Sequence, residues 1–401
     1  MTRKSFFRSP VGLIILATAT AGAFGYGVDD TNGRLARESR LMQDAGGRAL
    51  FLTDEPPKIK LGGQLKFRYQ ANFRDSAGLA TADNDTTIGF VTRRSKIYGK
   101  MTVSDGISAH FQLGFDRASG SAVLEIGEII WKFGDGFRFR AGQFKEPLLR
   151  EELVSSKRQL ASERSAVNET LNQDYSQGIE LEYSEDKWRG AVMISDGFAS
   201  DNTAFTSESE ADFAVTGRVE FLLGDASFKQ FKQFTSFRGS THGAMVGVAG
   251  HWQTRGDTNP SLASAVDQTT VTADFSFVGD GWNVYAAGIW RNMDVSAVTS
   301  ADDFGVVVQG GVFITDDDEL FARYDGFFPD DYAGATDFNT VTFGWNHYFL
   351  PESHAAKLTV DASYHFNVVG GSGIKTSDGH NLLADTNEGQ FGIIAQFQLL
   401  F

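Results

Sequence analysis

Hydrophobic and polar residues alternate along much of the chain. Between 59 and 73 the odd positions run from Ile59 to Phe73 and are almost all apolar, whereas the even positions include Lys66 and Arg68. A period of two is typical of a β-strand with two different faces, and this run is longer than the ~5–6 residues of a typical soluble strand. The same alternation returns at 107–116 and continues to Phe401. The pattern therefore predicts long amphipathic strands.

Sixteen segments of this kind can be marked along the sequence. They cover residues 59–73, 88–103, 107–116, 122–133, 137–144, 175–183, 188–196, 212–223, 241–254, 268–278, 282–292, 303–314, 319–327, 338–350, 356–368 and 389–401. An even number of antiparallel strands brings both ends of a barrel to one side, and sixteen to eighteen strands leave a water-filled lumen. We therefore predict an all-β protein, a 16-stranded antiparallel transmembrane β-barrel. Its apolar faces should meet lipid at Leu65, Phe67, Phe111, Phe115, Phe397 and Phe401, and its polar faces should line the lumen at Lys66, Arg68, Gln112 and Gln396.

The connections between these segments alternate in length. Those such as 104–106, 134–136 and 279–281 are tight, whereas most of the others are long, the link at 117–121 excepted. Short periplasmic turns and long external loops are typical of an outer-membrane barrel. The connection 224–240 is long where a turn is expected. It is either an elaborated periplasmic turn or a place where the strand count slips.

The N-terminal region has the pattern of a secretory signal peptide. Arg3, Lys4 and Arg8 precede an apolar run and a tract of small residues that ends at Ala23. A membrane anchor is the weaker reading, because the run falls short of the ~20 residues that span a bilayer. We predict a signal peptide at 1–23, a periplasmic extension at 24–57 and the barrel at 58–401. The terminal Phe401 is similar to the last residue of bacterial outer-membrane proteins, so we expect a Gram-negative-type outer membrane.

Composition narrows the function. The chain has 401 residues, no cysteine and a net charge of -15, which excludes disulfide, zinc-thiolate and iron–sulfur sites and disfavours nucleic acid as a partner. Its seven histidines are scattered and form no metal or catalytic motif. We predict no enzyme, no catalytic residues, no metal and no cofactor. An outer-membrane enzyme is expected on a smaller barrel, whose lumen side chains can fill.

Basic residues are concentrated in the first strands. Residues 58–165 carry a balance of +6, whereas 166–401 carry -22. If the polar faces line the lumen, cations there would raise the local concentration of anions. The predicted anion path consists of Lys66, Arg68, Arg94, Lys96, Arg138, Arg140, Arg150, Lys157, Arg158 and Arg164. The alternative is a wall that is merely polar, and selectivity would vanish or invert if Glu180, Glu182 and Asp274 reached the same constriction.

The connection 145–174 is the longest and the third external one. Pro147 stands as in the first turn of a helix, and Glu151 and Glu152 would complement the helix dipole. We therefore predict a helical third external loop. It either folds into the barrel and narrows it or lies over the rim as a solvated lid, and long structured loops tend to be functional.

Several motifs in this region resemble a known family. Gly142-Gln143-Phe144-Lys145-Glu146-Pro147, the pair Ser155-Ser156 and the run Glu163-Arg164-Ser165 are similar to the G-x-F-K-x-P, S-S and E-R-S motifs of the phosphate-selective porin O and P family. The resemblance covers roughly 58–401. It implies a trimeric sixteen-stranded barrel whose third loop enters the pore and whose arginines and lysines conduct phosphate or other anions. The acidic residues after 165, such as Glu180 and Glu182, differ from the strongly basic lumen of the phosphate-selective members.

These observations predict an outer-membrane porin, a passive water-filled channel for small solutes that prefers anions such as phosphate. A general or differently selective diffusion porin is the alternative, followed by an outer-membrane enzyme or adhesin. The expected partners are outer-membrane lipid, lipopolysaccharide, small anions and two further copies in a homotrimer.

Overall fold

The computed structural model describes residues 58–74, 85–116, 119–198, 200–204, 207, 210–255, 266–295, 299–330, 336–369, 374–376, 379–383 and 388–401. The predicted signal peptide and extension, residues 1–57, lie outside the described residues. None of the helices in these segments is long and apolar enough to cross a membrane.

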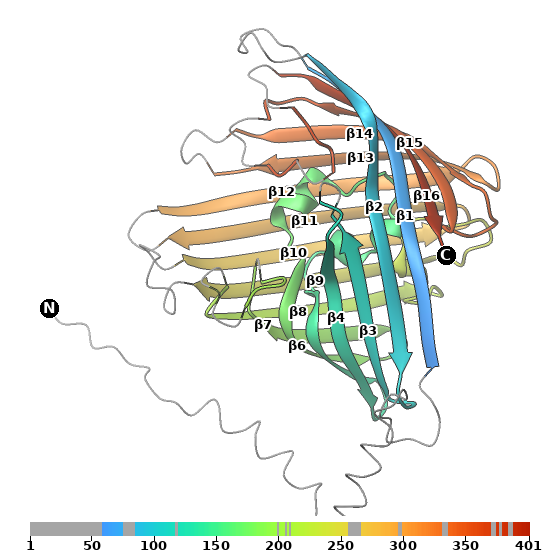
Figure 1. Cartoon of the computed structure of the whole chain (residues 1–401). Helices are drawn as coiled ribbons and strands as arrows, with labels where there is room; N and C mark the ends of the chain where they lie inside the picture. Colours follow the sequence, from blue (N-terminus) through green and yellow to red (C-terminus); the bar gives the residue numbers. More distant parts are fainter. Residues whose placement is uncertain are drawn as a thin grey trace, which may run out of the picture. The chain divides into compact units, whose positions relative to one another are not determined.

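Sixteen antiparallel strands close into one barrel, in which each strand pairs with its sequence neighbours and β1 pairs with β16 (Figure 1). The strands are β1 (Lys58–Phe73), β2 (Thr86–Thr102), β3 (Ile107–Phe115), β4 (Ala122–Phe133), β5 (Phe137–Lys145), β6 (Tyr175–Ser184), β7 (Trp188–Ser195), β8 (Phe213–Gly224), β9 (Gly243–Arg255), β10 (Val266–Gly279), β11 (Trp282–Val295), β12 (Thr299–Phe313), β13 (Asp318–Phe328), β14 (Phe338–Tyr348), β15 (Ala356–His365) and β16 (Gln390–Leu400). The predicted barrel is confirmed. The largest difference from the predicted bounds is at β12, which begins at Thr299 instead of residue 303.

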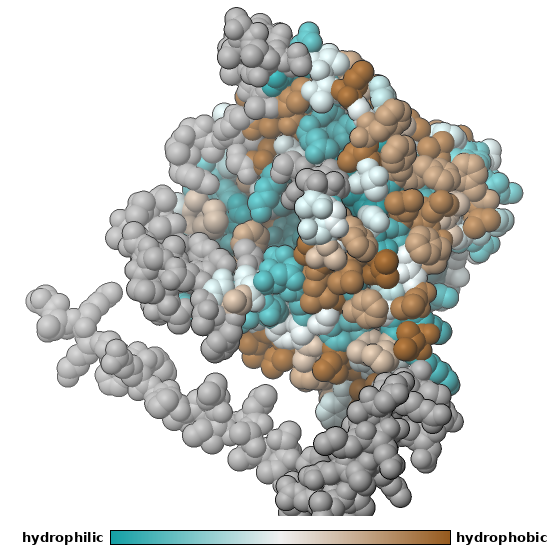
Figure 2. Space-filling view, in the orientation of Figure 1, coloured by the Kyte–Doolittle hydropathy of each residue, from teal (hydrophilic) through white to brown (hydrophobic). Residues whose placement is uncertain are grey.

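The two faces of the strands separate as their sequence pattern predicts. All six residues expected to face lipid have exposed side chains, whereas Lys66, Arg68 and Gln396 are buried on the inner side and Gln112 is half-buried. Apolar side chains cover the outer face around β1 and β16 (Figure 2). In a bilayer this arrangement places apolar atoms against lipid and leaves polar groups in the lumen.

Two β-bulges, one in β2 and one in β4, change which residues of these strands face the lumen. In β2 the register moves between the pairs Lys66–Arg94 and Phe67–Thr92, so that Arg93 has no opposite residue. In β4 the pairs Gln112–Ile126 and Leu113–Leu124 leave Glu125 unopposed in the same way. A bulge re-aims one side chain. Here it allows Arg93 and Arg94, adjacent in sequence, both to face the lumen.

The connection between β8 and β9 is an elaborated turn, and the strand count does not slip there. The two strands pair from Phe213–Thr254 to Gly224–Gly243 without a register shift. The residues between them form one short 3-10 helix, η2 (Gln230–Lys232), and bury Phe231, Phe234 and Phe237. This connection therefore folds toward the lumen.

The largest apolar cluster lies inside the barrel. Its members on the wall come from β9, β11, β12, β13 and β14, and the others come from the connection between β5 and β6 and from Phe234. The side chains of the strands do not fill the lumen of a barrel of this size, so other segments of the chain must do so. These segments build the site described next.

Candidate functional site

The connection between β5 and β6, residues 146–174, crosses the lumen. It contains the short helices α2 (Arg150–Leu153), η1 (Ser156–Arg158) and α3 (Ala166–Leu171), and Ser165 caps α3 by accepting a hydrogen bond from the Asn168 amide. Pro147 precedes the first helical turn by three residues, so its predicted place inside a helix is wrong. Most of the segment is irregular, and its backbone needs partners from the wall.

Side chains of the barrel wall supply those partners. The donors to the loop's carbonyl oxygens are Lys66 to Ser156 (2.8 Å), Lys357 to Gln159 (2.9 Å), Asn346 to Leu160 (3.1 Å) and Arg323 to Glu163 (2.8 Å). In return, the carboxylates of Asp361 and Asp325 accept from the amides of Ser162 (2.7 Å) and Ala166 (3.1 Å). The loop is thus fixed within the lumen and is not a lid on the rim.

One side of the loop is apolar and seals against part of the wall, which we call the packed side and which comprises β9–β14. The loop residues buried there are Leu148, Leu149, Val154, Leu160, Ala161, Ala166, Val167 and Leu171. Gly305 of β12 leaves room for them, because a Cβ at this position would lie 2.6 Å from both Val167 and Leu171. Full burial of a large aliphatic side chain stabilises by ~1.5–3 kcal/mol. Among the described residues, the packed side is thus closed by apolar contacts along the loop's apolar face.

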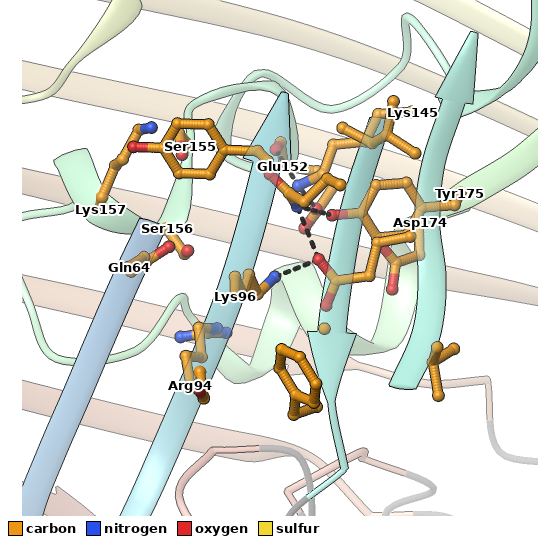
Figure 3. Close-up of a pocket in the computed structure, with 18 of the residues that line it drawn as sticks. Gln64, Arg94, Lys96, Lys145, Glu152, Ser155, Ser156, Lys157, Asp174 and Tyr175 are labelled. Carbon is orange, nitrogen blue, oxygen red and sulfur yellow. Dashed lines mark hydrogen bonds and ion pairs between the residues drawn. The ribbon is translucent and has the colours of Figure 1, made fainter. Parts of the chain in front are cut away.

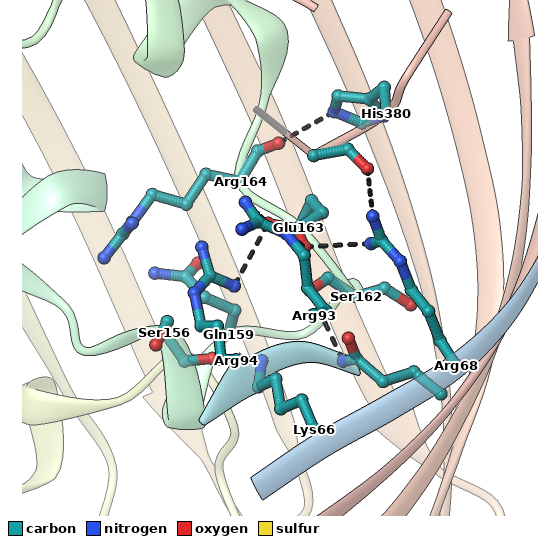
Figure 4. A network of polar contacts seen from close by, with 12 residues as sticks. Lys66, Arg68, Arg93, Arg94, Ser156, Gln159, Ser162, Glu163, Arg164 and His380 are labelled. Carbon is teal, nitrogen blue, oxygen red and sulfur yellow. Dashed lines mark hydrogen bonds and ion pairs between the residues drawn. The ribbon is translucent and has the colours of Figure 1, made fainter. Parts of the chain in front are cut away.

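Glu163 is the ionic centre of the loop. Its carboxylate accepts from Arg68 (2.9 Å), Arg93 (2.6 Å) and Arg94 (3.1 Å), which come from β1 and β2 (Figure 4). Burial disfavours its ionised form, but attraction to Arg93, Arg94 and Arg68 outweighs this cost and holds the pKa of Glu163 well below its ordinary value. Arg68 is fully buried. It fixes the loop, and its predicted place on an open anion path is wrong.

Residues 379–381, in the connection between β15 and β16, close over the same ionic centre. The carbonyl oxygen of Gly379 accepts from Arg68 (2.6 Å), and the carbonyl of Arg164 lies 3.0 Å from Nε2 of His380 (Figure 4). A Cβ on Gly379 would lie 2.7 Å from Cγ of Glu163, so the close approach requires glycine. Burial, assisted by the charge of Arg323, lowers the pKa of His380 to about 4. A second external connection is thus part of the constriction.

Other loop carboxylates also neutralise cations or bind wall hydroxyls. Glu152 pairs with Lys145 and with Arg164 (3.2 Å). Glu146 accepts from Ser195 and Thr216 at 2.5 and 2.6 Å. A prediction that counts only basic residues misses these carboxylates, which come from the same loop.

A cavity of about 550 Å³ opens between the loop and strands β1–β6 (Figure 3). Its lining includes the basic side chains of Arg94, Lys96 and Lys157 and the acidic side chains of Glu169 and Asp174. The Lys96 ammonium is 2.5 Å from Glu125, whereas that of Lys157 lies 4.3 Å from the centre of the Tyr98 ring. Lys157 and Asp174 lie on opposite sides of the cavity (Figure 3).

Two acids in this cavity ionise at unusually high pH. Loss of surrounding water, together with the charge of Glu152, raises the pKa of Glu169 to about 7 and that of Asp174 to about 6. Below these values both groups are neutral and the basic side chains dominate the cavity. Above them the two groups add negative charge to a lining that also contains Asp116, Glu125 and Glu152.

A second cavity of about 270 Å³ shares Leu153 and Ser155 with the first and extends along β5–β8. Its lining has seven basic side chains and three acidic ones: Arg138, Arg140, Arg150, Arg158, Arg189, Arg218 and Lys232 against Glu180, Glu182 and Glu220. The two cavities share lining residues of the loop and together follow the polar wall of β2–β8, which we call the open side; we refer to the two cavities together as the path. The predicted acids Glu180 and Glu182 do reach this path.

Ion pairs neutralise part of this charge. Arg138 lies 2.6 Å from Glu182, and Arg140 lies 2.6 Å from Glu128 and 3.0 Å from Glu180. Asp274 is buried against Arg218 at 2.7 Å and is absent from the lining of the path. Within the described part of the chain, the side chains of Arg158 and Lys232 make no hydrogen bond or ion pair. Together with Lys157 of the first cavity, whose ammonium contacts only the Tyr98 ring among the described groups, they are the cations most available to a passing anion.

The structure divides the ten predicted path residues into two groups. Lys66 and Arg68 hold the loop and lie outside both cavities, whereas the other eight line one of them: Arg94, Lys96, Lys157 and Arg164 the first, and Arg138, Arg140, Arg150 and Arg158 the second. Two of these residues also hold the loop: Arg150 donates a hydrogen bond to the Ser276 hydroxyl, and Arg164 donates one to the Glu151 carbonyl. Sequence reasoning missed Arg189, Arg218 and Lys232 of the second cavity. Arg189 could have been found from the parity of its strand, but Lys232 carries no such signal.

The described residues contain no group of three or more histidines and carboxylates that could hold a metal ion. What the arrangement offers is two charged cavities beside a loop that lies inside a closed barrel.

Comparison with known proteins agrees with this geometry. The model of the family described as phosphate-selective porin O and P matches residues 64–367. No curated protein sequence matches the chain.

Solved structures share the fold at low sequence identity. An anion-selective porin from Comamonas acidovorans has a TM-score of 0.59 and 12% identity, over 86% of this chain and all (100%) of that one. OmpT, an outer membrane protein of Vibrio cholerae in its trimer form, has a TM-score of 0.56 and 16% identity, over 86% and 100% of the two chains. The outer membrane channel DcaP of Acinetobacter baumannii has a TM-score of 0.55 and 12% identity, over 88% and 100%.

Proposed function

Since the chain belongs to the phosphate-selective porin O and P family, we propose that it is an outer-membrane porin in which small anions, phosphate among them, diffuse passively along the open side of the lumen. The protein is a channel and not an enzyme. The family match and the closed sixteen-stranded barrel support the channel. The anion preference is supported by the charges of the second cavity.

The single observation that carries this preference is the excess of basic side chains where the path runs beside the loop. Seven basic residues face three acidic ones in the second cavity, and Arg158 and Lys232 are free of ion pairs among the described residues. Fixed cations in a narrow, weakly solvated passage concentrate anions and exclude cations. The similarity to an anion-selective porin is consistent with the same preference.

Planar-bilayer recordings test the proposal. In a potassium chloride gradient the reversal potential of the wild-type channel should have the sign of chloride preference, and inorganic phosphate should reduce the chloride current if it binds along the path. Replacing Arg158 with alanine should lower the chloride-to-potassium permeability ratio by about two- to threefold, because it removes an unpaired cation from the passage. Lys187→Ala, in the exposed turn between β6 and β7, is the matched control. A wild-type reversal potential of zero would contradict the preference.

A general diffusion porin is the second candidate. The observation that favours it is the mixed charge of the first cavity, where Glu169 and Asp174 face the same water as Lys157. If those acids set the selectivity, potassium and chloride would permeate about equally at neutral pH.

Assembly and export belong to the same proposal. A signal peptide that ends near Ala23 would direct the chain to the periplasm, and the extension at 24–57 would remain there. The trimer form of the similar OmpT supports a homotrimer embedded in outer-membrane lipid and lipopolysaccharide. Native mass spectrometry of the extracted protein should give the mass of three chains, each beginning near residue 24, and a monomer mass would contradict the trimer.

A further inference from the structure

The connection between β8 and β9 is built unlike a periplasmic turn. Residues 225–242 include four phenylalanines at a spacing of three, Phe228, Phe231, Phe234 and Phe237. The last three are buried, and Phe237 packs on Phe313 and Tyr348 with ring centres 5.5 and 5.1 Å apart. Aromatic side chains of this size anchor a segment firmly when they are buried.

Polar contacts also hold this connection inside the barrel. The Ser236 hydroxyl donates to the carbonyl of Gly279 (2.6 Å), and the hydroxyls of Thr235 and Tyr348 lie 2.8 Å apart. Together with the buried rings, these bonds fix the segment against β10 and β14. It therefore occupies the periplasmic end of the lumen as an ordered element.

This connection meets the lumen loop directly. The amide of Phe234 donates to the carbonyl of Arg158 (3.1 Å), and the guanidinium of Arg150 donates to the carbonyl of Phe231 (2.7 Å). The same guanidinium lies 5.7 and 5.4 Å from the ring centres of Phe231 and Phe234, within cation–π range. The loop's two arginines in the second cavity are thus positioned by a segment that enters from the opposite end of the barrel.

The connection also contributes charge to the path. Phe231 and Lys232 line the second cavity beside Arg138, Arg158 and Arg189. Partial burial and repulsion by Arg189, Arg138 and Arg158 lower the pKa of Lys232, while Glu182 opposes that shift. Four cations therefore face one another at the periplasmic end of the path.

We propose that residues 225–242 form the second half of the selectivity constriction, in which Phe231 and Phe234 position Arg150 and Arg158 and Lys232 is a specificity-determining residue at the periplasmic exit. This inference rests on the proposed anion channel. It assigns selectivity to the meeting of two segments, one from each side of the membrane, and not to the external loop alone.

A charge-reversal pair tests the role of Lys232. Lys232→Glu should lower the chloride-to-potassium permeability ratio by about two- to threefold or more, because it replaces a cation in the passage with an anion. Lys229→Glu is the matched control, because it makes the same charge change three residues earlier in the chain. Lys229 is exposed and lies outside both cavities. Equal effects of the two substitutions, or no effect of either, would overturn the assignment.

A deletion tests the constriction independently of charge. Removing residues 226–241 leaves Gly224-Asp225-His242-Gly243 as a tight turn, and the single-channel conductance should rise because the periplasmic end of the path widens. Unchanged conductance of the folded variant would overturn the proposal. If the wild type proved unselective, the proposed function would fail while this conductance measurement still reported whether the segment narrows the path. If the deletion variant did not fold, Lys232→Glu would decide alone.

Discussion

The open side and the packed side of the barrel contact the same loop in different ways. Strands β2–β8 face it with arginines, lysines and glutamates across two connected cavities, whereas β9–β14 enclose its leucines and valines in an apolar cluster. Among the described residues, the first contact borders cavities, whereas apolar side chains fill the second.

This difference gives the uneven charge of the sequence a structural meaning. The acidic residues of β9–β16 do not line the two cavities, whereas Glu180 and Glu182 of β6 and Glu220 of β8 do. Asp325 and Asp361 accept hydrogen bonds from loop amides, and Asp274 is buried against Arg218. An excess of acid in the second half of the chain is thus compatible with an anion path along the first half.

The largest effect is expected from removing the ionic centre, the carboxylate of Glu163, which holds the loop to β1 and β2. Glu163→Gln keeps the shape of the side chain but leaves Arg68, Arg93 and Arg94 without their common carboxylate. Loss of one partner of a buried ion pair costs about 3–5 kcal/mol. We expect the free energy of unfolding in detergent to fall by that order and the loop to become accessible to protease. Asp186→Asn, in the exposed turn between β6 and β7, is the control. Equal stability of the two variants would show that the loop is held by packing alone.

The packed side can be weakened separately. Leu160 is fully buried in the apolar cluster, whereas Leu153 of the same loop is exposed and lines the path. Leu160→Ala should reduce the free energy of unfolding by about 2–5 kcal/mol, and Leu153→Ala should reduce it far less, because it leaves no buried cavity. Equal destabilisation by both substitutions would contradict the division into two sides.

The smallest expected effect is a pH dependence of selectivity on the open side. Between pH 5 and pH 8, Asp174 and Glu169 pass through pKa values of about 6 and about 7 and become negatively charged. The chloride-to-potassium permeability ratio should therefore fall as the pH rises. The double variant Asp174→Asn and Glu169→Gln should keep the low-pH ratio up to about pH 7, above which Lys96, whose pKa burial lowers to about 8, begins to lose its charge. A wild-type ratio that rises with pH would refute this assignment.

Much of this architecture could be predicted from the sequence. The face of each residue in β1 follows from its parity, because neighbouring side chains of a strand point to opposite sides. Once one face of a strand is apolar, the lipid bilayer leaves few alternatives for which face of that strand points outward. The same reasoning failed at Arg93, since a bulge shifts the parity by one residue, and a bulge depends on the partner strand.

What the sequence by itself determined is the barrel: its sixteen strands, their two faces and the identity of the long loops, all of which depend on local periodicity. What only the tertiary structure decided is which charges are free. Arg68 is bonded to Glu163 and to Gly379, residues 95 and 311 positions away, whereas Arg158 faces the path without a partner among the described residues. Coulombic interactions depend on distance in space, and a one-dimensional pattern contains no information about that distance. The selectivity of this channel is therefore a property of how its loop, its turn and its wall meet.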